Sequence, residues 1–224
     1  MRVKVWDLPL RLFHWLLVLA VIGALVTVNL GGNWMIWHGR FGMAVFALLV
    51  FRLVWGVLGS THSRFINFFP TPGRLLGYLR GQWQGLGHNP LGALSVFALI
   101  GLFGFQAASG LVSSDDIAFS GPLSRAVSSD LSSLLSGWHR RTEELIYLLV
   151  GLHVLAIAVY RLRGERLVGP MIHGRKEVKS PAEQSSGGGW LALLVALVIA
   201  AAALWLANGS WIPAPAPAPA VPAW

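Results

Sequence analysis

Four of the seven histidines lie inside apolar stretches of the chain, where an ionisable side chain is costly. They are His14, His38, His139 and His153. An imidazole in such a place can ligate a metal, relay a proton or hydrogen-bond to another helix, and each role needs a partner at the right distance. The chain has no cysteine, which excludes disulfides, iron–sulfur clusters, cysteine-ligated zinc, thiol catalysis and covalently attached haem.

The stretches that carry these histidines are apolar enough to cross a membrane. Of 224 residues, 55% are apolar and 12% are charged, and the mean hydropathy is +0.63. Soluble domains usually have about 25% charged residues, so an ordinary soluble protein is excluded. Because a span needs about 20 apolar residues, we predict five of them. They cover approximately residues 8–30, 34–58, 91–112, 137–160 and 190–207. Asp7 can cap the first helix, with Pro9 in its first turn.

Basic side chains are concentrated in alternate connections between the predicted spans. Twelve of the 17 lie before or in the first turn of the first span, between the second and third, and between the fourth and fifth. The opposite connections hold Arg125 beside Asp115, Asp116 and Asp130. Since basic loops stay in the cytoplasm, we predict a cytoplasmic N-terminus and a C-terminus outside. The same asymmetry accounts for the net charge of +8 without nucleic acid as a partner.

The depths of the four histidines match in two pairs. His139 and His153 are 14 residues apart, so on one straight helix they share a face and lie about 21 Å apart along its axis. His14 lies near the cytoplasmic start of the first span, at the predicted depth of His153. His38 lies near the outer start of the second span, at the predicted depth of His139. We therefore predict the pairs His14–His153 and His38–His139.

Two imidazoles that face one another at one depth suit the axial positions of haem iron. Two such pairs predict two haems stacked across the membrane, with all four histidines as metal ligands. In the alternative interpretation these histidines hydrogen-bond between helices or relay protons, as in a haem-free transporter. Zinc is disfavoured, because no third Asp, Glu or Cys ligand lies at either depth.

Arg52 is a second candidate for cofactor binding. It follows His38 by 14 residues, so it shares that face of the second span near the cytoplasmic depth. A buried guanidinium needs an anion, and a haem propionate would provide one. The alternative is an arginine that extends to lipid phosphate. The remaining histidines, His62, His88 and His173, are interpreted as loop or surface residues.

Several motifs resemble the bacterial cytochrome b561 / Ni,Fe-hydrogenase b-type cytochrome family. They are WDLPLRLFHW (Trp6–Trp15), H-x-x-x-G (His38–Gly42), RLVWGVLGS (Arg52–Ser60), GHNPLGA (Gly87–Ala93) and MIHGRK (Met171–Lys176). The resemblance covers approximately residues 1–179. It implies an all-α membrane protein of the bacterial inner membrane, a four-helix transmembrane bundle that binds two b-type haems. Its ligands on helices 1, 2 and 4 correspond to His14, His38, His139 and His153.

The chain is expected to have four parts. Residues 1–179 form the four-helix di-haem cytochrome b domain, 180–189 (SPAEQSSGGG) a flexible linker, and 190–212 a fifth, C-terminal transmembrane helix. Residues 213–224 (PAPAPAPAVPAW) form a tail at the outer face, expected in polyproline II conformation. The tail is either a disordered end or a docking strip for an external protein.

The resemblance implies transmembrane electron transfer in a respiratory chain, between membrane quinone and a redox partner at the periplasmic face. A c-type cytochrome is the expected partner, and membrane lipid surrounds the helices. Two alternatives from the same resemblance are a haem-containing anchor subunit of a larger oxidoreductase, such as a hydrogenase, and a superoxide:quinone oxidoreductase. Copurification with a large catalytic subunit would select the first, and rapid reduction of the purified protein by superoxide would select the second.

Overall fold

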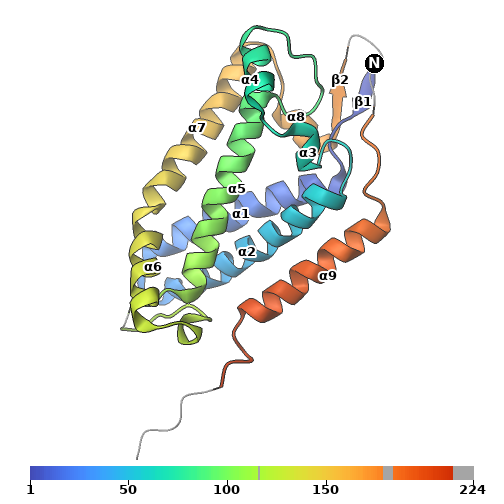
Figure 1. Cartoon of the computed structure of the whole chain (residues 1–224). Helices are drawn as coiled ribbons and strands as arrows, with labels where there is room; N and C mark the ends of the chain where they lie inside the picture. The colour runs from blue at the N-terminus through green and yellow to red at the C-terminus, as the bar shows by residue number, and fades with distance from the viewer. Residues whose placement is uncertain (116, 179–183, 214–224) are drawn as a thin grey trace, which may run out of the picture.

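The computed structural model describes residues 1–115, 117–178 and 184–213, and long helices dominate it (Figure 1). The long helices are α1 (Leu8–Leu30), α2 (Met35–Leu58), α5 (Pro90–Val112), α7 (Glu143–Leu162) and α9 (Trp190–Ala207). The shorter elements are β1 (Arg2–Lys4), α3 (Phe65–Phe68), α4 (Pro72–Leu79), α6 (Ser129–Arg141), α8 (Val168–His173) and β2 (Arg175–Glu177), with 3-10 turns at Gly32–Trp34 and Ser124–Ala126.

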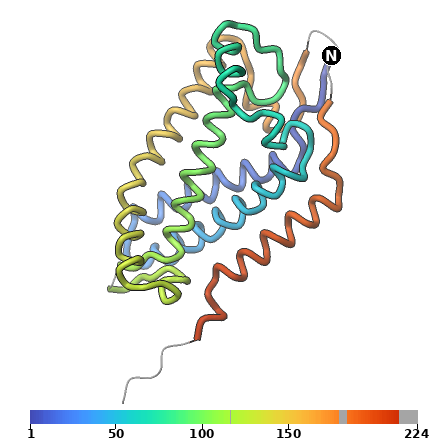
Figure 2. The backbone as a smooth tube through the Cα atoms, viewed as in Figure 1, coloured from blue at the N-terminus to red at the C-terminus, as the bar shows by residue number. Residues whose placement is uncertain are grey.

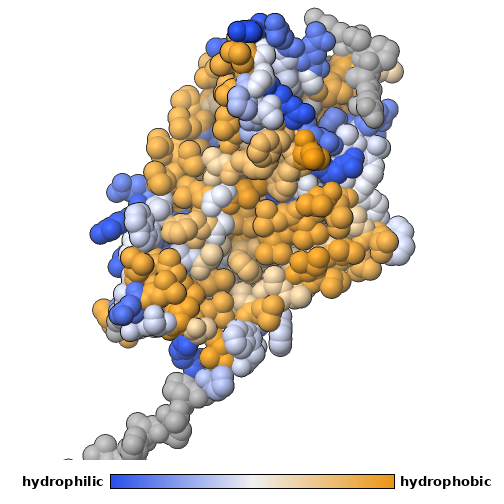
Figure 3. All heavy atoms as spheres, viewed as in Figure 1, coloured by the Kyte–Doolittle hydropathy of each residue, from blue (hydrophilic) through white to orange (hydrophobic). Residues whose placement is uncertain are grey.

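Five segments of the described chain are long and apolar enough to cross a membrane, which confirms the predicted number of spans. Their mean hydropathies lie between 1.9 and 2.6, and at most 33% of each most apolar stretch is buried inside the protein. The apolar side chains therefore form the outer surface, as the hydrophobic band in Figure 3 shows. Such a surface needs lipid around it, so the chain is a multi-pass membrane protein.

The fourth predicted span differs from the structure at its start. We predicted one helix over 137–160, but α6 begins at Ser129 and α7 follows after an interruption at Thr142. The Thr142 hydroxyl donates a 2.7 Å hydrogen bond to the carbonyl of Trp138, and the Leu145 amide bonds to the Thr142 carbonyl. Such side-chain bonding to the preceding turn disturbs a helix. His139 and His153 therefore lie on different helices, and the spacing of one straight helix does not apply to them.

The helices define two ends of the molecule (Figures 1 and 2). We call the end that holds the chain's N-terminus, β1, β2, α3, α4 and α8 the N-terminal end, and the other the opposite end. At the N-terminal end, β1 and β2 pair as an antiparallel sheet. Asp7 begins α1 there, because its carboxylate accepts a 2.7 Å hydrogen bond from the Leu10 amide. The predicted cap is confirmed.

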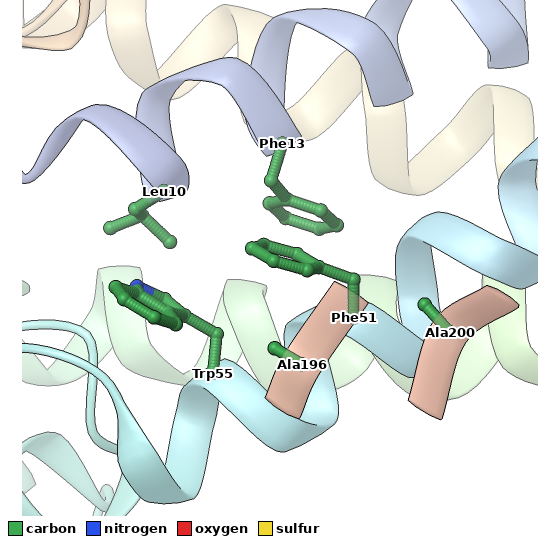
Figure 4. Close-up of a cluster of buried hydrophobic side chains, with 6 residues drawn as sticks. All are labelled: Leu10, Phe13, Phe51, Trp55, Ala196 and Ala200. Atoms are coloured by element: carbon green, nitrogen blue, oxygen red, sulfur yellow. The ribbon is translucent and has the colours of Figure 1, made fainter. Parts of the chain in front are cut away.

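A cluster of buried apolar side chains joins α1, α2 and α9 (Figure 4). Its members are Leu10, Phe13, Phe51, Trp55, Ala196 and Ala200. The two alanines are four residues apart on α9, so they share the face that meets α2. Small side chains on this face let the two helix backbones approach closely, which is how helices associate within a membrane.

Ala200→Leu is expected to weaken the packing of α9 against α2. The Ala200 side chain is 8% exposed and lies beside Phe51, so three additional carbons have no space there. Overpacking of this kind costs about 1–3 kcal/mol. Thermal unfolding in detergent measures the loss, and Ala201→Leu is the matched control because Ala201 is exposed. Equal unfolding midpoints for the two variants would contradict this account of α9.

The predicted linker is described only over 184–189. There the Ser185 amide donates to the Lys4 carbonyl at 2.9 Å, and the Thr61 amide donates to the Ser186 carbonyl at 2.8 Å. These bonds attach the start of α9 to β1 and to the end of α2. Residues 180–183 and the tail at 214–224 lie outside the described residues, so the polyproline II conformation stays a prediction.

Candidate functional site

His38 and His139 meet at the opposite end of the bundle. His38 lies in the first turn of α2 and His139 near the end of α6, and their ring centres are 6.1 Å apart with the planes at 84°. Both rings line a cavity between α1, α2, α5 and α6. Its other walls are mostly apolar and include Val21, Leu25, Val45 and Ala107. The structure thus brings together two imidazoles from helices that are a hundred residues apart in sequence.

Hydrogen bonds orient both rings. The Nδ1 atom of His38 lies 2.9 Å from the Ala24 carbonyl, which can only accept, so this Nδ1 carries the proton. The Nδ1 atom of His139 lies 3.1 Å from Oγ of Ser109, whose own hydroxyl bonds to the Phe105 carbonyl at 2.7 Å. That hydroxyl therefore accepts the proton of His139 Nδ1. Both Nε2 atoms are left with a lone pair, the arrangement that supports metal-ligating histidines.

Glycines leave space beside the paired rings. A Cβ atom added at Gly42 would meet nothing within 4 Å, and Gly42 lines the cavity. A Cβ added at Gly110 would lie 3.0 Å from Cε1 of His139. The open space at Gly42 suits a flat apolar group, whereas the absence of a side chain at Gly110 lets the His139 ring lie against α5.

The residues at this end fit a haem better than a bare metal ion. Two neutral imidazole nitrogens would supply two ligands to the haem iron, and the apolar walls suit a porphyrin. Zinc normally has four protein ligands or three with water. Within the described part of the chain, no group of three His, Cys, Asp or Glu side chains could hold a metal ion.

Gly42→Leu is expected to block the binding of a haem at His38 and His139. The leucine side chain would extend into the cavity that the glycine leaves open, while both histidines remain. Haem quantification on the purified variant should therefore show one haem per chain fewer than in wild type. Gly101→Leu is the control, because Gly101 also has open space around it but is exposed on α5. An unchanged haem content in Gly42→Leu would contradict the assignment of this cavity.

His14 and His153 lie nearer the N-terminal end. His14 is in the second turn of α1 and His153 is halfway along α7, and the two side chains are within electrostatic range of each other. The Nδ1 atom of His14 is buried and has no hydrogen-bond partner in the described residues. A buried ring nitrogen without a partner is costly, so this position suits a bound group that the protein atoms do not supply.

Arg52 is buried at the N-terminal end, with 2% of its surface exposed. Its Nη1 atom donates to the Ser63 carbonyl at 3.1 Å, and its guanidinium lies 4.3 Å from the centre of the Phe65 ring. An arginine with this burial does not extend to lipid phosphate, so that alternative is wrong. Its role toward a haem propionate stays a prediction.

Asp7 is a buried hydrogen-bond centre that sequence analysis recognised only as a helix cap. Its carboxylate accepts bonds from Nε1 of Trp55 at 3.1 Å, from Oγ of Ser63 at 2.6 Å and from Oγ of Ser60. These donors come from α2 and the loop after it, within the RLVWGVLGS motif and just beyond. Asp7 thereby fixes the start of α1, and with it His14, against the end of α2.

His88 lies in the loop before α5, as predicted, but its ring packs against aromatic side chains. Its ring lies between Trp6 and Phe68, with centres 4.6 Å and 4.5 Å away, and its Nδ1 atom is buried without a partner in the described residues. Burial lowers the pKa of His88 to about 3, with smaller contributions from the positive charge of Arg52, His62 and His14. The ring is therefore neutral at physiological pH. His173 is exposed as predicted.

Comparisons with known proteins gave one kind of match. The family described as Prokaryotic cytochrome b561 matches residues 5–174, which extends from the residue after β1 to the residue after α8 and leaves α9 outside. Neither the curated proteins nor the solved structures that were searched gave a match.

Proposed function

The chain belongs to the prokaryotic cytochrome b561 family, and from this we propose that it carries electrons across the membrane through two b-type haems. Membership makes it a membrane protein of b-type haem electron transfer. We assign one haem to His38 and His139 and the other to His14 and His153. Haem bound in this way supplies a one-electron carrier, and the chain's residues hold it, orient it and exclude water.

One observation carries the proposal: His38 and His139 face one another across an apolar cavity with both Nε2 atoms free to ligate. Hydrogen bonding between helices accounts for the two Nδ1 atoms alone, whereas haem ligation also gives a role to the two Nε2 atoms. Two histidines that both bound the haem iron would leave no position open for oxygen. This favours electron transfer over oxygen chemistry at the metal.

The proposed orientation places the N-terminal end in the cytoplasm and the opposite end in the periplasm. It rests on the basic residues, which are concentrated in the connections at the N-terminal end. The His38–His139 site then lies on the side where a soluble partner such as a c-type cytochrome would dock. Quinone from the membrane is the proposed exchange partner of the chain within the inner membrane.

Sealed vesicles that contain the full chain test this function directly. We expect two haems per chain in the purified protein, and we expect dithionite added outside to reduce ferricyanide trapped inside. Vesicles with His139→Ala protein should lose at least nine-tenths of that rate, since one of the two carriers is missing. A colourless preparation from haem-replete cells, or equal rates in both vesicle types, would exclude the proposal.

A further inference from the structure

The small sheet at the N-terminal end has an unbalanced charge on its outer face. In its register Arg2 is opposite Glu177, and Lys4 is opposite Arg175. These four side chains share one face, because side chains alternate along a strand, and Val3 on the other face is 1% exposed. Arg2 and Glu177 form an ion pair at 3.2 Å. Lys4 and Arg175 are like charges in direct opposition, an arrangement that destabilises a strand pair.

Arg11 adds a third cation beside this pair. Its guanidinium donates to the carbonyls of Asp7 and Ile172 and lies over Gly174, where an added Cβ would be 3.2 Å from its Nε. Gly174 directly precedes Arg175. Within residues 1–115, 117–178 and 184–213, no carboxylate forms an ion pair with Lys4, Arg11 or Arg175. Lys4 and Arg175 are thus opposite each other in the sheet, Arg11 lies beside the glycine that precedes Arg175, and no acid of the described residues neutralises any of the three.

An apolar surface continues from these cations along the membrane-spanning part of α1. Leu8, Leu12, Leu16 and Leu19 follow one another at helical spacing and are each at least 51% exposed. Beside them, α8 lies along the second turn of α1, because Nε1 of Trp15 donates to the Met171 carbonyl at 3.1 Å. Ile172 of α8 is 61% exposed. The sheet and α8 lie at the N-terminal end of the long helices (Figure 1), where lipid headgroups would meet acyl chains around a protein that spans the membrane.

We propose that Lys4, Arg11 and Arg175 bind the phosphate headgroup of an anionic phospholipid, with an acyl chain along the exposed leucines of α1. The charge of the headgroup would relieve the repulsion between the opposed cations, and it supplies acceptors for donors that the protein leaves without an acid. The apolar surface directly beneath the cations selects a lipid over soluble phosphate. Anionic lipids are attracted to juxtamembrane basic residues on the cytoplasmic side, the side proposed here for this end.

Lipid titration of the purified, haem-loaded chain in detergent tests this site. The measurement is the thermal unfolding midpoint as phosphatidylglycerol is added, with phosphatidylcholine and inorganic phosphate in parallel. We expect phosphatidylglycerol alone to raise the midpoint. Lys4→Gln should raise the half-saturating lipid fraction roughly fivefold, and Lys4→Gln with Arg175→Gln should raise it more than tenfold. Without lipid, both variants should be at least as stable as wild type, because repulsion is removed.

Two double variants are matched controls. Arg2→Gln with Glu177→Gln removes a neutralised pair from the same strands, and Arg163→Gln with Arg166→Gln removes the same net charge from the nearby loop. Neither should change the half-saturating fraction by more than twofold. If the Arg163/Arg166 variant raised the half-saturating lipid fraction as much as the Lys4/Arg175 variant, lipid binding would depend on general surface charge. If inorganic phosphate raised the unfolding midpoint as much as phosphatidylglycerol, the site would bind soluble anions. If Glu183→Gln changed the unfolding midpoint and phosphatidylglycerol did not, the cations would be neutralised by an acid of the chain itself. Each of these three results overturns the proposal.

Discussion

His139→Ala is expected to yield a protein with one haem per chain, and His38→Ala is expected to lose that same haem. The two rings face each other at 6.1 Å between centres, so removal of either leaves the iron with one protein ligand. His14→Ala and His153→Ala should instead lose the other haem, because these two side chains interact electrostatically with each other nearer the N-terminal end. The four variants should therefore fall into two groups of two.

Haem quantification together with reduced-minus-oxidised spectra measures this result. The residual spectrum should be the same within each group and should differ between groups. The double variant His38→Ala with His139→Ala should have lost no more haem than either single variant, since both ligands serve one site. His173→Ala is the control, because His173 is exposed and lies outside both pairs. A protein in which His38→Ala and His139→Ala lost different haems would rule out the assigned pairs.

A milder variant separates ligation from orientation at the same site. Ser109→Ala removes the hydroxyl that accepts from His139 Nδ1, while both ligands remain. Removal of a group that orients a ligating histidine usually lowers metal affinity by about 10–100-fold. Haem at this site should therefore dissociate faster on dilution, with the haem at His14 and His153 unaffected. Equal dissociation of the two haems would indicate general destabilisation instead.

The sequence could predict the contact between His38 and His139 because the signal of a histidine in an apolar span is physical and local. An imidazole in an apolar span is rare, and spacing along a helix gives its depth and face. Depth alone paired His38 with His139, and the structure brings these two rings together. The interruption at Thr142 could not be predicted in this way. The Thr27 hydroxyl makes the same bond to the carbonyl four residues before it while α1 continues to Leu30, so a threonine in the sequence does not mark such a break.

His88 and Asp7 show what a reading of separate segments misses. His88 stands in a polar connection, GHNPLGA, and only the tertiary packing of Trp6 and Phe68 around it makes its environment apolar. Asp7 has an ordinary local signal as a helix cap, which hides its bonds to residues about 50 positions away. Long-range contacts between polar side chains leave no periodicity in the sequence, whereas apolar faces do.

Asp7→Ala is expected to destabilise the N-terminal end by about 3–5 kcal/mol, which is typical for the loss of one partner from a buried charged network. The change leaves the Trp55 indole, Ser60 and Ser63 without their shared acceptor, and it removes the cap of α1. It also removes the negative charge that interacts with buried Arg52. These losses act together, because every one of the donors points at the same carboxylate.

Asp7→Asn distinguishes the charge from the cap. Asparagine also caps helices well, so α1 keeps its start. Its amide group, however, presents donors where Trp55, Ser60 and Ser63 need an acceptor, and the buried guanidinium of Arg52 stays without a counter-charge. We therefore expect Asp7→Asn to lose most of the stability that Asp7→Ala loses.

Reversible unfolding in mixed detergent, followed by tryptophan fluorescence, measures both, with Asp130→Ala in the first turn of α6 as an exposed control. Since Asp7 fixes α1 near His14, haem should be lost first from the His14–His153 site and retained at His38 and His139. Stability equal to that of Asp130→Ala, or haem loss from the opposite end first, would show that Asp7 is no more than a cap.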